Sequence, residues 1–171
     1  MESQMSNIIK VDVNIERPNE LIEFAQTLKK VIVEQKLYAN IQGKNYALVE
    51  AWQFCGGILK ALPVVESVKD LSDENTIRYR AKVNIKRLDT QEIIGSGIAI
   101  CTNKEKGKQY FEEYAIASMA QTRAIGKAYR NAFGWLMKLA GYEATPAEEM
   151  DFARQVTADE NKLNEIKKAN Q

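Results

Sequence analysis

The alternation of apolar and polar residues predicts four β-strands in this chain. Residues 9–15 alternate with a period of two, which is typical of a strand with one face on a core. Three more strand-like runs, separated by polar turn segments, span residues 64–71, 76–88 and 93–102. The last run contains Gly95 and Gly97, and glycines inside a strand indicate a bulge or the close approach of another backbone. We therefore expect an antiparallel three-stranded meander and a short N-terminal strand.

Helical spacing of apolar residues predicts three helices. The first spans residues 18–36 and begins with a proline, which fits the first turn of a helix. The second spans residues 46–62, is weakened by a Gly-Gly pair and ends at Pro63. The third is long and spans residues 111–139. The order of elements predicts an α+β domain with a β-β-β-α core, in which helices pack on one face of the sheet.

The C-terminal part of the chain has a different character. Thr145 and Glu148 have the spacing of a capping box, with a proline at the first helical position, and residues 157–160 repeat the pattern. The segments that follow are polar and only weakly amphipathic. We therefore expect one domain over residues 1–142, followed by peripheral helices and a frayed tail over residues 143–171.

The composition argues against several classes of function. The 171 residues include no histidine, which removes Ser-His-Asp and Cys-His catalysis and His-ligated zinc. The two cysteines, Cys55 and Cys101, form no CxxC motif, and no carboxylate pattern typical of a catalytic metal is present. We therefore expect no catalytic residue, no metal site and no cofactor. The sequence shows no disulfide framework and no signal peptide, so we expect an intracellular protein. It also has no long apolar run, so we expect no membrane segment.

The net charge of +1 conceals a strong segregation of charge along the chain. Residues 1–75 contain 8 Lys/Arg and 11 Asp/Glu, a net charge of −3. Residues 76–138 contain 12 and 5, a net charge of +7, and residues 139–171 contain 4 and 7, again −3. This asymmetry indicates a basic interaction surface in the middle of the chain.

Five polar positions in the run 76–88 share one face of the predicted strand, because side chains alternate between the two faces. They are Arg78, Arg80, Lys82, Asn84 and Lys86. Their spacing on that face, about 6.6–6.8 Å, is close to the phosphate spacing of an extended nucleic-acid strand. A solvated outer face is the alternative. The absence of any acid among the five positions favours a row that binds phosphates.

A second group of cations lies on the predicted long helix. Arg123, Lys127 and Arg130 follow the spacing that places side chains on one stripe of a helix. The stripe is either a solvated helix face or the second wall of a basic groove that includes the strand row. Tyr46 and other tyrosines near these segments are either half-buried or placed to stack on bases. Alanines near the stripe serve either close packing or helix propensity alone.

Three stretches resemble single-strand annealing proteins of the Rad-fifty-two type, and more closely the small annealing proteins of phages and mobile elements. They are residues 43–52 (GKNYALVEAW), residues 117–134 (ASMAQTRAIGKAYRNAFG), which follow the meander, and residues 139–150 (LAGYEATPAEEM). The resemblance implies a ring or helical filament in which single-stranded DNA lies in a basic groove between the meander and the long helix. It implies backbone contacts from Lys127 and Arg130. The family often has two adjacent cations here, whereas this chain has Gly126 before Lys127.

The sequence therefore predicts a protein that binds single-stranded DNA and anneals complementary strands in recombination and repair, without nucleotide hydrolysis. The expected phosphate ligands are Arg78, Arg80, Lys82, Lys86, Arg123, Lys127 and Arg130, with Tyr46 beside them. The alternative is an oligomeric module that coats single-stranded DNA or RNA without annealing it. An enzyme is disfavoured by the missing catalytic groups. The resemblance also implies an exonuclease and a single-strand binding protein as partners, and a location in the cytoplasm, that of the host if a phage encodes the chain.

Overall fold

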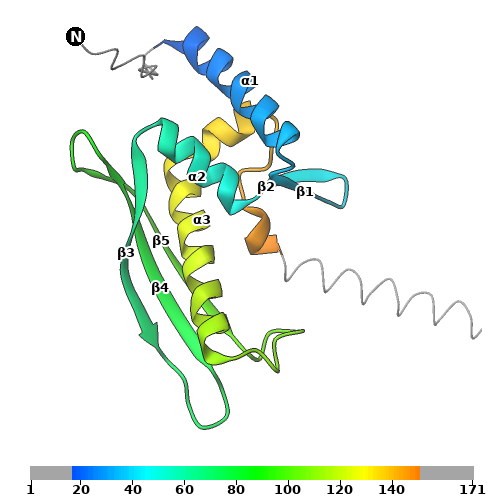
Figure 1. Ribbon diagram of the computed structural model, residues 1–171, viewed down its shortest axis with the longest axis vertical. Helices are drawn as coiled ribbons and strands as arrows, with labels where there is room; N and C mark the ends of the chain where they lie inside the picture. The colour runs from blue at the N-terminus through cyan, green and yellow to red at the C-terminus, as the bar shows by residue number, and fades with distance from the viewer. Residues whose placement is uncertain (1–16, 151–171) are drawn as a thin grey trace, which may run out of the picture.

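The computed structural model describes residues 17–150 (Figure 1). The strand predicted at 9–15 and the second capping box at 157–160 lie outside the described residues. The elements follow in the order α1 (Pro18–Glu34), β1 (Tyr38–Ile41), β2 (Lys44–Ala47), α2 (Val49–Ile58), β3 (Ala61–Asp70), β4 (Arg78–Arg87), β5 (Ile93–Thr102), α3 (Glu113–Leu139) and the short 3₁₀ helix η1 (Ala147–Met150). None of these helices is long and apolar enough to be a membrane span.

The centre of the molecule is the antiparallel sheet β3-β4-β5, with α3 packed lengthwise on one face (Figure 1). The helices α1 and α2 and the hairpin β1–β2 lie beside the C-terminal half of α3. In the sheet, Val83 of β4 pairs with Val65 of β3 and with Gly97 of β5. The predicted α+β class and the three-stranded meander packed on a long helix are confirmed.

The contact between α3 and the sheet is unusually close because small residues lie on both sides. Ala124 and Ala128 of α3 are completely buried against the sheet. A Cβ atom added to Gly97 of β5 would lie 2.4 Å from the backbone nitrogen of Ala128, and one added to Gly95 would lie 2.7 Å from its carbonyl oxygen. The glycines in this strand thus serve the close backbone approach that their positions predicted. The pairing of β4 with β5 also shifts near Gly95, which marks a local bulge.

The predicted helix over residues 46–62 is wrong at both ends. Tyr46 belongs to β2, because Gln42 and Gly43 both have a positive φ and form the tight turn of the hairpin β1–β2. At the other end, Pro63 lies within β3 rather than after a helix. A proline is tolerated there because β3 is an edge strand of the three-stranded sheet, and an edge residue can lack a ladder donor.

Residues 143–150 pack against the domain instead of extending from its periphery. The backbone N–H of Glu143 donates a hydrogen bond to the carbonyl of Asn45 at 2.8 Å. Pro146 is fully buried and lies against Gly126 of α3, where an added Cβ would be 3.0 Å away. Ala147 is buried in a small cluster with residues of the hairpin β1–β2. The described part of the predicted peripheral segment is therefore part of the packed domain.

Candidate nucleic-acid interface

The cations of β4 lie on the face of the sheet that α3 does not cover. The alternate residues Ala81, Val83 and Ile85 are completely buried on the helix side. The polar residues between them therefore point to the opposite side, and all are exposed or partly exposed. We call this group the outer row; it consists of Arg78, Arg80, Lys82, Asn84 and Lys86. The face assignment predicted from the period of two is confirmed.

One carboxylate enters the outer row. Glu66 lies at the bulge of β3 and accepts hydrogen bonds from Lys82 Nζ at 2.8 Å and Asn84 Nδ2 at 2.7 Å. These two hydrogen bonds lower the pKa of Glu66 from its usual value. Within residues 17–150, no carboxylate forms an ion pair with Arg80 or Lys86. The row therefore keeps a strong excess of positive charge.

Aliphatic side chains line both sides of the outer row. On β5, Ile98 pairs with Lys82 and Ile100 pairs with Arg80, and each isoleucine is 50% exposed. On β3, Val64 is also among the exposed aliphatic residues of this face. The outer face thus combines cations in the middle with apolar contact surface at the sides. Such a surface can hold a ligand that is both charged and apolar, since charge and contact area lie within one strand spacing of each other.

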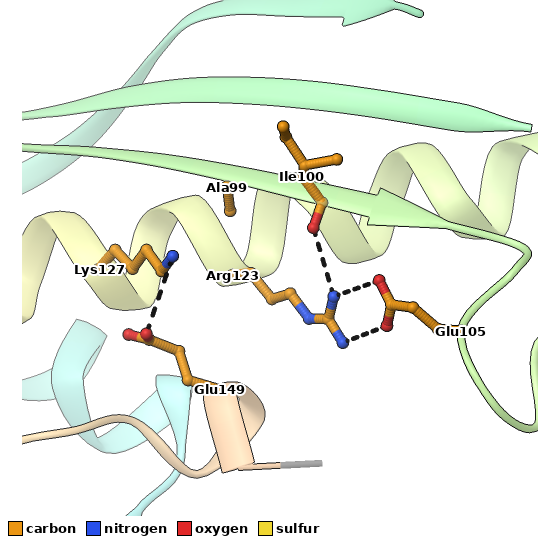
Figure 2. A pocket seen from close by; sticks show the side chains of 6 residues that line it. All are labelled: Ala99, Ile100, Glu105, Arg123, Lys127 and Glu149. Carbon is orange, nitrogen blue, oxygen red and sulfur yellow. Dashed lines mark hydrogen bonds and ion pairs between the residues drawn. The ribbon is translucent and has the colours of Figure 1, made fainter. Parts of the chain in front are cut away.

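The first cation of the α3 stripe, Arg123, is tied to the loop that follows β5 (Figure 2). Its guanidinium donates to both carboxylate oxygens of Glu105 at 2.8 Å and to the carbonyl of Ile100 at 3.4 Å. The Arg123 side chain is only 13% exposed. Burial alone would raise the pKa of Glu105, but hydrogen bonds from Arg123 and Lys108 outweigh it and lower the pKa to about 2. Arg123 therefore serves as a buried structural tie, and a phosphate could reach it only by displacing Glu105.

The other two stripe cations share one carboxylate of η1. Glu149 Oε2 lies 3.2 Å from Arg130 Nη1 and 3.9 Å from Lys127 Nζ. Burial raises the pKa of Glu149, and the nearby cations Arg130 and Lys127 offset only part of that effect. Figure 2 shows the ion pair between Lys127 and Glu149. Both residues line a pocket of about 280 Å³. The pocket is also lined by Ile100, Glu105 and Arg123.

The two groups of cations do not form one groove. The outer row faces away from α3, whereas the stripe lies on α3 beside the edge strand β5, so the sheet separates the two groups. The space between the meander and α3 is filled by core packing, such as the contact of Gly97 with Ala128. A basic groove between the strand and the helix is therefore a wrong prediction. The reason is that the apolar faces of both elements pack on each other.

Tyr46 is buried and cannot stack on a base as expected. Its side chain is 8% exposed and packs in a cluster with Ile41 and Ala147, so no face of the ring is available to stack on a base. The exposed tyrosines are instead Tyr110 and Tyr114, next to the N-terminus of α3. The carboxylates that pair with the stripe were also not foreseen, although the acidic pair at 148–149 follows a capping pattern in the sequence.

Comparisons with known proteins give no assignment: no model of a known family matches this chain, and no curated protein matches it significantly. Within residues 17–150, no group of three His, Cys, Asp or Glu side chains is placed to hold a metal ion. Functional inference therefore depends on the chemistry of the outer row and of the α3 stripe.

Proposed function

We propose that this protein binds single-stranded DNA along the outer row and promotes the annealing of complementary strands without nucleotide hydrolysis. The observation that carries the proposal is the outer row itself. Its four cations share one face of β4, and Glu66 is the one carboxylate that the described residues place among them. Phosphate contacts of this kind provide affinity that does not depend on sequence.

The geometry of the outer face supports a strand bound in an extended form. Side chains on one face of a strand repeat at about 6.6–6.8 Å, which suits successive phosphates of an extended chain. The exposed aliphatic residues Ile98 and Ile100 on one side and Val64 on the other offer apolar contact to sugars and bases. A strand that is extended, neutralised and held mainly by its backbone keeps its base edges available for pairing, and annealing needs nothing more.

The first experiment measures the affinity of a dye-labelled 30-nucleotide strand by fluorescence anisotropy. The double variant Arg80→Ala/Lys86→Ala removes two row cations that have no carboxylate partner among the described residues. We expect it to weaken binding by about 10-fold or more at low salt, and to reduce the salt slope by about 1.4, since each lost single-strand contact contributes about 0.7. The matched control, Lys30→Ala/Lys36→Ala, removes two cations on and just after α1. Equal losses in both variants would refute binding at the outer row.

The second experiment separates annealing from coating. Two complementary strands are mixed with and without the protein, and duplex formation is followed by quenching of a dye pair. A rate that exceeds the protein-free rate supports annealing. A rate no faster than the protein-free control would refute it and leave a module that only coats single strands. Loss of strand length in the presence of Mg²⁺ would instead indicate a nuclease.

The proposal includes assembly into a ring or filament, which rests on the resemblance to annealing proteins. In the described part of the chain, the sheet ends at β3 on one side and at β5 on the other. Unpaired strand edges and exposed aliphatic side chains are both suited to contacts between copies. Sedimentation velocity with and without DNA measures the assembly, and a strict monomer under both conditions would refute it.

A further inference from the structure

The strongest unexplained feature of the structure is the carboxylate of Glu149, which lies on the α3 stripe. Its side chain is 13% exposed and comes from the short η1 segment rather than from the helix or the sheet. Only Oε2 pairs with Lys127 and Arg130. Oε1 is buried, and none of the described residues gives it a hydrogen bond. Burying a charged oxygen without a donor is unfavourable. This cost offsets part of the stabilisation that the two cations give to the carboxylate.

The neighbouring carboxylate provides a direct contrast. Glu105 accepts hydrogen bonds from Arg123 at both of its oxygens and from Lys108 at one of them. Its pKa is lowered, whereas burial raises the pKa of Glu149. Glu105 is therefore a firm part of the loop structure. Glu149, by contrast, is the weakly held anion of the pair.

The space around Glu149 suits a larger anion. The pocket of about 280 Å³ lies between β5, the stripe and η1, with Arg123, Lys127 and Glu149 in its wall (Figure 2). Glu105 also lines it, but its charge is neutralised by Arg123 and Lys108. A DNA phosphodiester carries the same single negative charge as a carboxylate. Its two non-bridging oxygens share that charge and could accept from Lys127 and Arg130 separately. Arginine binds phosphate with strong charge-assisted hydrogen bonds. Exchange of one anion for the other leaves the charge balance of the site unchanged.

The anchor of the segment does not have to move for this exchange. Pro146 is fully buried against Gly126, and its carbonyl accepts the backbone N–H of Glu149 at 3.1 Å. The Glu149 carboxylate lies several rotatable bonds beyond that anchor. It can swing away from the stripe by side-chain rotation while residues 143–147 stay packed.

We propose that Glu149 is a built-in competitor for DNA phosphate at Lys127 and Arg130, and that a phosphate of the bound single strand displaces its carboxylate. This inference rests on the proposed function, because it concerns how a bound strand reaches the stripe. The chain would then have two DNA-binding surfaces on opposite sides of the sheet. The outer row is always available, whereas the α3 stripe is available only after Glu149 is displaced. The affinity of the second surface is set by a carboxylate of the same chain.

The test compares the full-length protein with Glu149→Gln, which keeps the shape of the side chain and removes its charge. We expect Glu149→Gln to bind a labelled 30-nucleotide strand about 5- to 10-fold more tightly. We also expect a steeper salt slope, by about 0.7, because one further phosphate of the single strand is contacted. Adding Lys127→Ala and Arg130→Ala to Glu149→Gln should abolish the gain. Glu149→Ala provides a second variant should the glutamine side chain keep its contact with the stripe.

The control is Glu143→Gln, which removes another carboxylate of the same segment, one that pairs with Lys138 at 3.0 Å outside the stripe. A gain in Glu143→Gln equal to that in Glu149→Gln would overturn the proposal, because a general charge effect would explain both. The proposal would also be overturned if wild type and Glu149→Gln bound the strand with equal affinity, or if neither protein bound it. The affinity of the outer-row variant Arg80→Ala/Lys86→Ala for the same strand tests the proposed function separately. A loss of binding there with no change in Glu149→Gln would refute the displacement of Glu149 alone.

Discussion

Glu105 is the residue through which the loop after β5 is held to α3, and its replacement tests this part of the structure most directly. Its carboxylate accepts from Arg123 at 2.8 Å at both oxygens and from Lys108. Both cationic side chains are largely buried. Glu105→Gln leaves these two cations without the negative charge that neutralises them. Breaking a buried ion pair by removing one partner is strongly destabilising, since the remaining charge stays buried.

The magnitude follows from the pKa of Glu105, which is lowered from 4.5 to about 2. This lowering corresponds to about 3 kcal/mol of stability, because each tenfold change in the acid dissociation constant is worth about 1.4 kcal/mol. The pKa is lowered in the folded state, so this stability is fully present above the unfolded pKa. It is lost as the pH falls from about 4.5 through about 2. We therefore expect Glu105→Gln to lower the free energy of unfolding by about 3 kcal/mol at pH 7 and by about half as much at pH 3.

The assay is urea unfolding followed by tryptophan fluorescence, at pH values from 7 down to 3. Trp52 is completely buried and reports the loss of the core. Five other carboxyl groups of the described residues have a lowered pKa and also contribute to acid unfolding. They are present in both proteins, so their effects cancel in the difference. They are Glu66, Asp70, Asp73, Asp89 and Glu143. A difference between wild type and Glu105→Gln that stays constant from pH 7 to pH 3 would refute the assigned ion pairs.

Two further predictions concern the core. Gly97→Val should destabilise the fold by about 3 kcal/mol or more in urea unfolding, since its Cβ would meet the Ala128 nitrogen at 2.4 Å. Gly57→Ala, with nothing within 4 Å of the added Cβ, should be neutral or stabilise by up to about 1 kcal/mol, and an equal loss in both variants would contradict the close packing of α3 on β5. Tyr129→Phe should cost about 1–2 kcal/mol at pH 7, because the buried hydroxyl donates to the Ala61 carbonyl at 3.0 Å. A thermal midpoint unchanged from wild type would show that this carbonyl finds another donor.

The periodicity of the sequence determined the parts of the fold that depend on local order. The period of two in β4 identified which side chains are buried, because a strand has only two faces and apolar burial selects one of them. The glycines of β5 indicated a close backbone approach, and α3 of the structure supplies it. The hairpin β1–β2 was missed, since strands of four residues carry too little periodic signal to be told from a helix start.

The position of the cations in space was decided by the tertiary structure alone. The sequence by itself determined that the outer row shares one face of β4 and that Arg123, Lys127 and Arg130 share one stripe of α3. Periodicity describes each element separately, and it does not state how two elements face each other. Here α3 and β4 bury their apolar faces against each other, and this packing places the outer row and the stripe on different sides of the sheet. It also brings Glu149 onto Lys127 and Arg130, a contact that no local pattern contains.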